Sequence, residues 1–267
     1  MLEVFIKPGK SVTQVYKLTN NGEPVIVTSH IAILTPSGIK EDPSFTAEKW
    51  LSLLNLDVRL NEPFLLPSGQ TKQIILRINP PADAKEQDYY RALVFSTTPN
   101  PAGNTTMSQI SENLATPLLV TVTSTGLIPK GAVLTSFELP SFIDSFGPLT
   151  IDAQVQNTGR SYFHPNGKID LKGPIGKGSY KINPSVILAG ERKRLIAVTN
   201  EEKNSLHTLT LPGFFIGKYE VELDFSLDEG KSRITAKKTF YALPFKASLV
   251  ASIIVVLIYL LGRRKKK

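Results

Sequence analysis

Hydrophobic and polar residues alternate along most of this 267-residue chain with the period of two that is typical of β-strands. The alternation is clear at residues 12–18, 74–79 and 118–123, and Leu2–Ile6 has the character of a first strand. Glycine, proline and asparagine separate these segments, and a weak helical pattern occurs near Thr46–Leu54. Many short strands, frequent turns and few helices predict an all-β sandwich.

Two halves of the chain present the same motifs in the same order. Each has a strand that ends in an Asn-x-Gly turn, a second glycine turn that opens a strand, and a late strand that begins with tyrosine. These motifs lie at residues 20–22, 66–72 and 89–96 in the first half, and at 157–159, 188–193 and 218–226 in the second. We therefore predict two tandem immunoglobulin-like sandwiches over 1–126 and 131–243, with a hinge between them. The late tyrosines are expected to tie their strands to earlier loops.

The carboxyl-terminal region departs from this pattern. Residues 247–261 contain no charged side chain, and the basic residues that follow Gly262 are Arg263, Arg264, Lys265, Lys266 and Lys267. A hydrophobic run that ends in a basic cluster is typical of a membrane span with a cytoplasmic stop signal. The run covers only about 22 Å, so residues from Ala242 onwards are needed to reach a bilayer thickness of about 30 Å. We predict one transmembrane helix over 244–262, in contact with membrane lipid, and a basic cytoplasmic tail over 263–267.

The charge distribution predicts on which side of the membrane the sandwiches lie. Of 31 Lys and Arg residues, six lie at or beyond Lys246, which leaves 25 basic against 23 acidic residues in the body. The body is therefore nearly neutral, and nucleic acid is not an expected partner. Because basic tails stay cytoplasmic, a single-pass protein with an extracytoplasmic body is expected. Residues 1–8 do not resemble a signal peptide, so we interpret the signal as absent from this sequence.

Residues that would carry chemistry are scarce. The chain has no cysteine, which excludes disulfides, thiol catalysis and Cys-ligated metals. His30, His164 and His207 are far apart and form no paired-ligand motif. Gly173–Ser179 lacks the Walker spacing, so a strand connection is expected there. We expect no catalytic residue, no cofactor site and no metal site, and we do not expect an enzyme.

Three segments are candidates for partner binding. Residues 97–116 are rich in Ser, Thr, Asn and Pro and show no strand pattern, so they form either a binding loop or a disordered one. Leu118, Val120 and Val122 either form an edge strand that a partner can extend or face the core of the domain. Leu243–Ala247 resembles a sortase signal only in part, since lysine replaces the threonine, and a proline in the first turn of the helix explains it as well.

Several motifs of the first half resemble those of a known family. They are Trp50–Leu53, Phe64–Gly69, Ile74–Ala84 and Tyr89–Phe95. They are similar to the first domain of the WxL-interacting surface proteins of Gram-positive bacteria and, more distantly, to the first domain of periplasmic pilus chaperones. The resemblance implies a cell-surface protein that binds other surface proteins or a peptidoglycan-type wall polymer through its sandwich domains.

Pilus chaperones supply an edge strand to a subunit and hold its terminal carboxylate with a basic pair. By this resemblance, the strand Pro117–Thr123 has the apolar alternation that strand donation needs. No Lys or Arg occurs between Arg91 and Lys130, however, and Lys7 or Lys10 supplies at most one member of the pair. This departure and the predicted anchor distinguish the chain from a pilus chaperone.

Three hypotheses follow from the sequence. The first is a non-enzymatic, membrane-anchored, extracytoplasmic adaptor that binds surface proteins or wall polymer. The second is a membrane-bound assembly chaperone for surface or pilus subunits, which acts by strand donation from Pro117–Thr123. The third is an enzyme whose site the sequence does not reveal.

Overall fold

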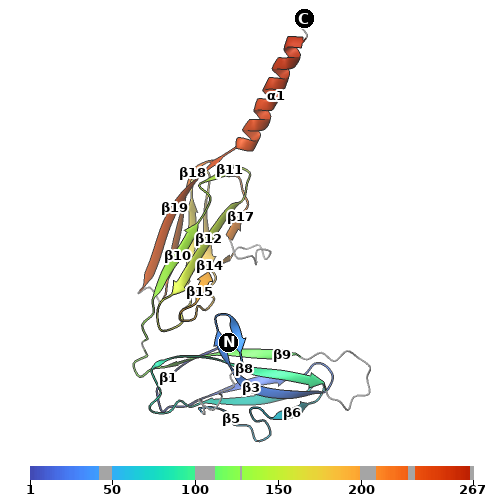
Figure 1. Cartoon of the computed structure of the whole chain (residues 1–267), viewed down its shortest axis with the longest axis vertical. Coiled ribbons are helices and arrows are strands. Elements are labelled where there is room, and N and C mark those ends of the chain that lie inside the picture. Colours follow the sequence, from blue (N-terminus) through green and yellow to red (C-terminus); the bar gives the residue numbers. More distant parts are fainter. Residues whose placement is uncertain (42–49, 100–111, 127, 199–208, 228–231, 265–267) are drawn as a thin grey trace. The chain divides into compact units, whose positions relative to one another are not determined.

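The computed structural model describes residues 1–41, 50–99, 112–126, 128–198, 209–227 and 232–264. The chain divides into two compact units, Met1–Pro129 (unit 1) and Lys130–Lys267 (unit 2). Each unit is built mainly from β-strands, and a helix follows the last strand of unit 2 (Figure 1).

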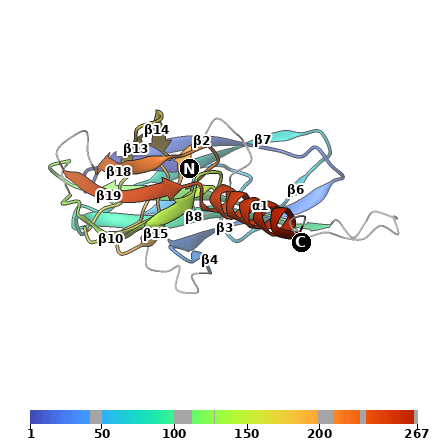
Figure 2. The ribbon, with the colours of Figure 1, turned by 90° about the horizontal axis from the view of Figure 1, so that it is seen from above.

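Unit 1 is a sandwich of two sheets. Its strands are β1 (Leu2–Ile6), β2 (Val12–Thr19), β3 (Val25–Thr35), β4 (Gly38–Lys40), β5 (Leu51–Leu53), β6 (Pro63–Leu66), β7 (Thr71–Ile78), β8 (Gln87–Pro99) and β9 (Asn113–Val122). One sheet has the order β1-β9-β8-β3-β4, with β6 also paired to β3, and the other has the order β2-β7-β5. Figure 2 shows β2 running beside β7, its antiparallel partner.

The core of unit 1 lies between these two sheets. Ile74, Leu76 and Ile78 of β7 have no exposed surface, while the residues between them are only partly buried. This is the expected result of alternation, because successive side chains of a strand point to opposite faces. Leu93 of β8 and Leu118 of β9 belong to the same hydrophobic cluster and come from the facing sheet. Burial of each such side chain contributes about 1.5–3 kcal/mol to folding.

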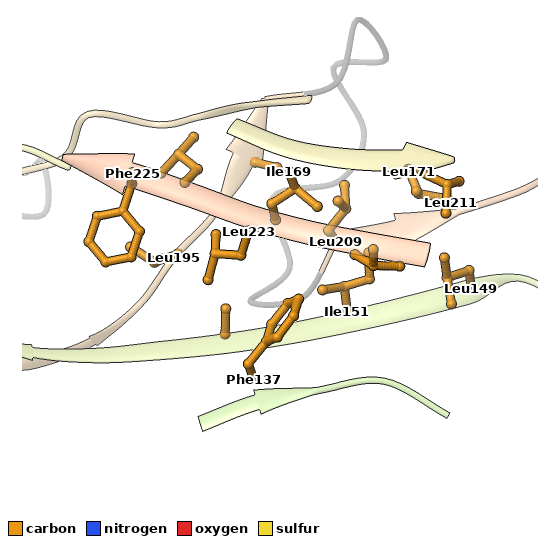
Figure 3. Packing of buried hydrophobic residues seen from close by; sticks show 14 of the residues in the cluster. Phe137, Leu149, Ile151, Ile169, Leu171, Leu195, Leu209, Leu211, Leu223 and Phe225 are labelled. Atoms are coloured by element: carbon orange, nitrogen blue, oxygen red, sulfur yellow. The ribbon is translucent and has the colours of Figure 1, made fainter. Parts of the chain in front are cut away.

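Unit 2 repeats the two-sheet plan. Its strands are β10 (Ala132–Glu138), β11 (Phe142–Asp144), β12 (Leu149–Asn157), β13 (Asn166–Lys172), β14 (Lys177–Ile182), β15 (Arg192–Arg194), β16 (Ala197–Val198), β17 (Leu209–Leu211), β18 (Gly217–Ser226) and β19 (Arg233–Leu243). One sheet has the order β11-β19-β18-β13-β14-β16; the other contains β10-β12-β15, with β17 also paired to β12. In Figure 3, Phe137 and Ile151 of one sheet face Leu223 and Ile169 of the other.

The helix α1 (Phe245–Arg264) corrects the predicted membrane span. Strand β19 runs to Leu243, so Ala242 and Leu243 belong to a strand and do not lengthen the helix. The side chains of α1 are described as far as Tyr259, which corresponds to about 22 Å of helix. Within the described residues no helix has the length and apolarity that crossing a bilayer requires. The predicted transmembrane helix over 244–262 is therefore wrong, and so is the single-pass membrane localisation deduced from it; the predicted lipid partner is not supported.

Most of the basic tail lies outside the described residues. Lys265, Lys266 and Lys267 lie outside the described residues, and the side chains of Arg263 and Arg264 are not described. Their predicted role as a stop signal depended on the membrane span that the structure contradicts.

Of the other local predictions, two are confirmed and one is wrong. Leu2–Ile6 forms the predicted first strand, and residues 173–176 join β13 to β14, so the strand connection expected there is confirmed. The helical pattern near Thr46–Leu54 is wrong at its described end, because Leu51–Leu53 forms β5 and pairs with β7. Pairing with a buried neighbouring strand outweighs the weak helical propensity of so short a segment.

Candidate functional site

Strand β9, which contains the predicted edge residues, lies inside its sheet over half of its length. Leu118, Val120 and Val122 have no exposed surface and belong to the core of unit 1. On one side β9 pairs with β8, and on the other Leu118–Val122 pairs in parallel with β1. These three residues therefore form no edge strand, and the alternative, that they face the core, is the one found.

The other half of β9, Asn113–Pro117, has one unpaired side, which we call the open edge. It pairs with Ala92–Ser96 of β8, but β1 begins opposite Leu118 and extends away from it. Among the described residues no strand pairs with the outer side of Asn113–Pro117. The predicted loop over 97–116 is thus strand at both described ends, and its residues 100–111 lie outside the described part of the chain.

Hydrogen bonds show which backbone groups the open edge presents. The amide of Thr97 donates to the carbonyl of Glu112 at 2.9 Å, and the amide of Thr123 donates to the carbonyl of Ile6 at 3.0 Å. Because backbone groups of successive strand residues point to opposite sides, even-numbered residues of β9 bond to β8 and odd-numbered residues face outward. Asn113 and Ala115 therefore present an amide and a carbonyl to the outer side.

Pro117 is the sequence signal that marks this edge. A proline inside a strand is tolerated where its missing N–H would face away from a neighbouring strand. Pro117 is an odd-numbered residue of β9, so its nitrogen faces the side on which the sheet ends. The alternation of apolar residues did not reveal this edge. It predicted an edge strand at residues 118–122, and it gave no information on which part of β9 pairs with β1.

A groove of about 550 Å³ lies beside the open edge. One wall is formed by the end of β2 and the turn after it, and the other by Glu112, Asn113 and Leu114 at the start of β9. Apolar side chains line the space between these walls, namely Leu18, Val25, Val27, Leu66 and Phe95. Leu114 remains 57% exposed although it lies on the core-facing side of β9. The groove therefore offers apolar surface next to unpaired backbone groups.

Asn20 fixes the turn that forms the first wall. Its side-chain amide donates to the carbonyls of Glu23 (2.8 Å) and Leu66 (3.0 Å), and its side-chain oxygen accepts from the amide of Gly22 (2.9 Å). Its backbone amide donates to the carbonyl of Gln70 at 3.0 Å. Asparagine suits this position because it carries both a donor and an acceptor within reach of its own turn. The wall is thus held in place by hydrogen bonds within unit 1.

A carboxylate lies at the opposite end of β9. The hydroxyls of Ser124 and Thr123 donate to the carboxylate of Glu86. The hydrogen bond from Ser124 is the main reason that the pKa of Glu86 lies below its usual value. Lys7 and Lys10 are exposed, in the turn after β1. The two lysines thus share one turn, which directly follows the residue of β1 that pairs with Val122.

The tyrosines and histidines have structural surroundings. The hydroxyl of Tyr219 donates to the carbonyl of Ile175 at 2.8 Å, and that of Tyr89 to the carbonyl of Lys85 at 3.2 Å, which confirms that the late tyrosines tie strands to earlier segments. His30 lies 3.5 Å from Glu41, and His164 contacts the carbonyl of Pro184. His207 lies outside the described residues. In the described ranges no three His, Asp or Glu side chains group as metal ligands would.

Comparisons with known proteins give similar structures but no family. No family model matches the chain, and no curated protein matches it. A similar solved structure is the Class 5 fimbriae chaperone CfaA, with 12% identity, coverage of 89% of this chain and 96% of that one, and a TM-score of 0.42. The CupB2 chaperone of Pseudomonas aeruginosa has 10% identity, coverage of 89% and 97%, and a TM-score of 0.41.

A third similar structure is the Salmonella enterica SafA pilin in complex with the SafB chaperone, with 13% identity, coverage of 88% and 92%, and a TM-score of 0.40. The names of these neighbours include chaperones of fimbriae and of a pilin, and a relation to WxL-interacting proteins is not shown. All three scores are below 0.5, and the two-sheet arrangement of each unit follows from its own strand pairing.

Proposed function

We propose that this chain is a non-enzymatic assembly chaperone that holds a strand of a β-rich surface or pilus-type subunit on the open edge, Asn113–Pro117. The observation that carries the proposal is the division of β9 into a half closed by β1 and a half with an unpaired outer side. An incoming strand at this edge hydrogen-bonds to backbone groups and so needs no defined sequence.

The groove provides the second part of the interaction. A strand paired with the open edge directs every second side chain toward the space between the two sheets of unit 1. Val27 and Phe95 line that space, and Leu114 adds an exposed apolar side chain at its rim. Apolar side chains of the partner strand would thus be removed from water. This burial contributes a favourable free energy of about 25 cal/mol for each Å², which offsets part of the cost of association.

The proposal moves the strand-donating segment within β9. The sequence placed it at Pro117–Thr123, but Leu118–Val122 is already paired on both sides. A chaperone that holds a strand needs backbone groups that are available without unfolding its own sheet. Within β9, the half that precedes Leu118 meets this condition. Wall polymer as a partner stays a prediction.

The decisive experiment changes one outward-facing amide. In Ala115→Pro the donor that faces the partner is removed, while the ladder to β8 keeps its hydrogen bonds because Ala115 does not contribute to it. Ala115→Val is the matched control, since it retains the N–H and suits a strand. Each variant is produced together with the surface or pilus-type subunits encoded by neighbouring genes, and the soluble yield of the subunits is measured.

We expect the wild-type chain and Ala115→Val to raise the soluble yield of a subunit at least fivefold, and Ala115→Pro to lose this effect. Hydrogen exchange of the complex should show protection of the amides of Asn113 and Ala115. A subunit whose yield is equal with Ala115→Val and Ala115→Pro, while both variants remain folded, contradicts the proposal.

A further inference from the structure

The rim of the groove carries charge of one sign. Among the groove residues that the structure describes, the charged ones are Glu23 and Glu112, and no lysine or arginine lines the groove. Glu23 lies in the turn after β2, and Glu112 immediately precedes β9, so the two walls contribute one carboxylate each. Both residues are exposed, and neither carboxylate forms an ion pair with a described residue.

Both carboxylates lie at the same end of the groove. Glu112 pairs with Thr97, and Thr97 pairs with Val27, which places them beside the start of β3 and the turn that contains Glu23. Strand β1 begins at the other end of the open edge, opposite Leu118. The acidic end of the groove is therefore the end remote from β1, and the middle of the groove is apolar.

We infer that the strand held at the open edge alternates apolar and polar residues and carries a lysine or arginine at the end that lies remote from β1. This inference rests on the proposed function and names the chemistry of its partner. The apolar side chains that line the groove favour a strand in which apolar and polar residues alternate, because only every second side chain of a strand faces the groove. The two carboxylates select the cation, because complementary charge favours association and like charge disfavours it.

The length of the open edge limits the segment that binds. Asn113–Pro117 spans about 16 Å at 3.3 Å for each residue, so about five partner residues pair with it. The basic residue follows or precedes these residues, depending on the direction of the partner strand. Since Glu23 and Glu112 are exposed, the attraction to them is screened by salt, and it weakens as ionic strength rises above that of physiological buffer.

The test uses two synthetic peptides with the same core, Val-Thr-Val-Thr-Val. In the first peptide two lysines flank this core on each side, and in the second peptide two glutamates do. Basic residues on both sides make the test independent of strand direction. Binding of each labelled peptide to the full-length chain is measured by fluorescence anisotropy at 50 mM and 500 mM salt. One double variant combines Glu23→Gln with Glu112→Gln. The control is a second double variant in which Glu62 and Glu138 are neutralised, because these two residues do not line the groove.

We expect the lysine-flanked peptide to bind at least tenfold more tightly than the glutamate-flanked one at low salt. The preference should fall to within about twofold in the Glu23→Gln, Glu112→Gln variant and at high salt, and it should persist in the control. Equal binding of both peptides, abolished by Ala115→Pro, leaves the strand-holding function intact and overturns the charge inference. Binding of neither peptide, or binding unaffected by Ala115→Pro, overturns both.

Discussion

The two units contain the same turn in different surroundings. Asn157 of unit 2 repeats the contacts of Asn20: its side-chain amide donates to the carbonyls of Ser161 (2.9 Å) and Ile187 (3.0 Å), and its side-chain oxygen accepts from Gly159 (2.9 Å). Its backbone amide donates to the carbonyl of Glu191 at 2.9 Å, as that of Asn20 does to Gln70. One local sequence pattern thus forms one hydrogen-bonded turn twice.

The surroundings differ because only unit 2 has a strand of its own against this turn. The amides of Thr158 and Gly159 donate to the carbonyl of Gly131, and β10 follows directly and pairs with β12. In unit 1 the described chain provides no such strand, and the groove lies beside Gly22 instead. The comparison shows that the same turn is covered by a strand in unit 2 and borders a groove in unit 1.

Glycine substitutions at the equivalent turn positions should separate the units most strongly. A Cβ at position 159 would lie 2.4 Å from the amide nitrogen of Gly131, whereas a Cβ at position 22 would meet only the side-chain oxygen of Asn20, at 3.7 Å. We expect Gly159→Ala to destabilise unit 2 by about 3 kcal/mol because the start of β10 must move. Gly22→Ala should change the stability of unit 1 by less than about 0.5 kcal/mol.

Hydrogen exchange of the full chain measures these two effects separately, since it reports on the strands of each unit. Increased exchange confined to β10 and β12 in Gly159→Ala supports the comparison. Equal effects of the two substitutions would show that the turn in unit 1 is as crowded as that in unit 2.

Replacing the turn asparagines should give the next largest difference. Asn157 has no exposed surface, so Asn157→Ala leaves the carbonyls of Ser161 and Ile187 buried without this donor. We expect a loss of about 2–3 kcal/mol of unfolding free energy. Asn20 is only partly buried, and water can replace its side chain, so Asn20→Ala should cost about 1 kcal/mol. Urea unfolding with a probe in each unit compares them, and a larger cost in unit 1 would contradict the interpretation.

Acidification should act at the end of unit 2 that adjoins α1. The backbone amide of Lys246 donates to the carboxylate of Asp144 at 2.9 Å, and that of Phe146 at 3.1 Å; these bonds, chiefly the first, hold the pKa of Asp144 below its usual value. The stabilisation is present above the pKa of the unfolded chain, near 4, and is lost as pH falls through the lower folded value. Circular dichroism and amide exchange of α1 between pH 7 and pH 2 measure it.

In Asp144→Asn we expect the first turn of α1 to exchange faster at pH 7 and to lose most of its dependence on acid. Asp83→Asn is the control, because Asp83 is exposed and lies in unit 1. A helix whose acid response is the same in Asp144→Asn and the wild type would show that this carboxylate does not cap α1.

The comparison of the units also shows which structural features the sequence patterns could predict. Alternation at residues 74–78 determined which side chains enter the core, because a strand has only two faces. The Asn-x-Gly turns and the late tyrosines were predictable for a similar reason, since each acts on residues close to it or on one nearby loop. These features depend on local geometry that a short stretch of sequence specifies.

Tertiary structure determined the features on which the proposed function depends. The pairing of β1 with Leu118–Val122 joins segments more than 100 residues apart in the chain, and no local pattern encodes that register. Likewise Ala242 and Leu243 join β19 because β11 pairs with them, and Asp144 caps α1 across 102 residues. The chain by itself determined many of the strands and which of their faces are apolar, because these depend on local alternation. Only the pairing of distant segments determined which backbone groups stay unpaired among the described residues.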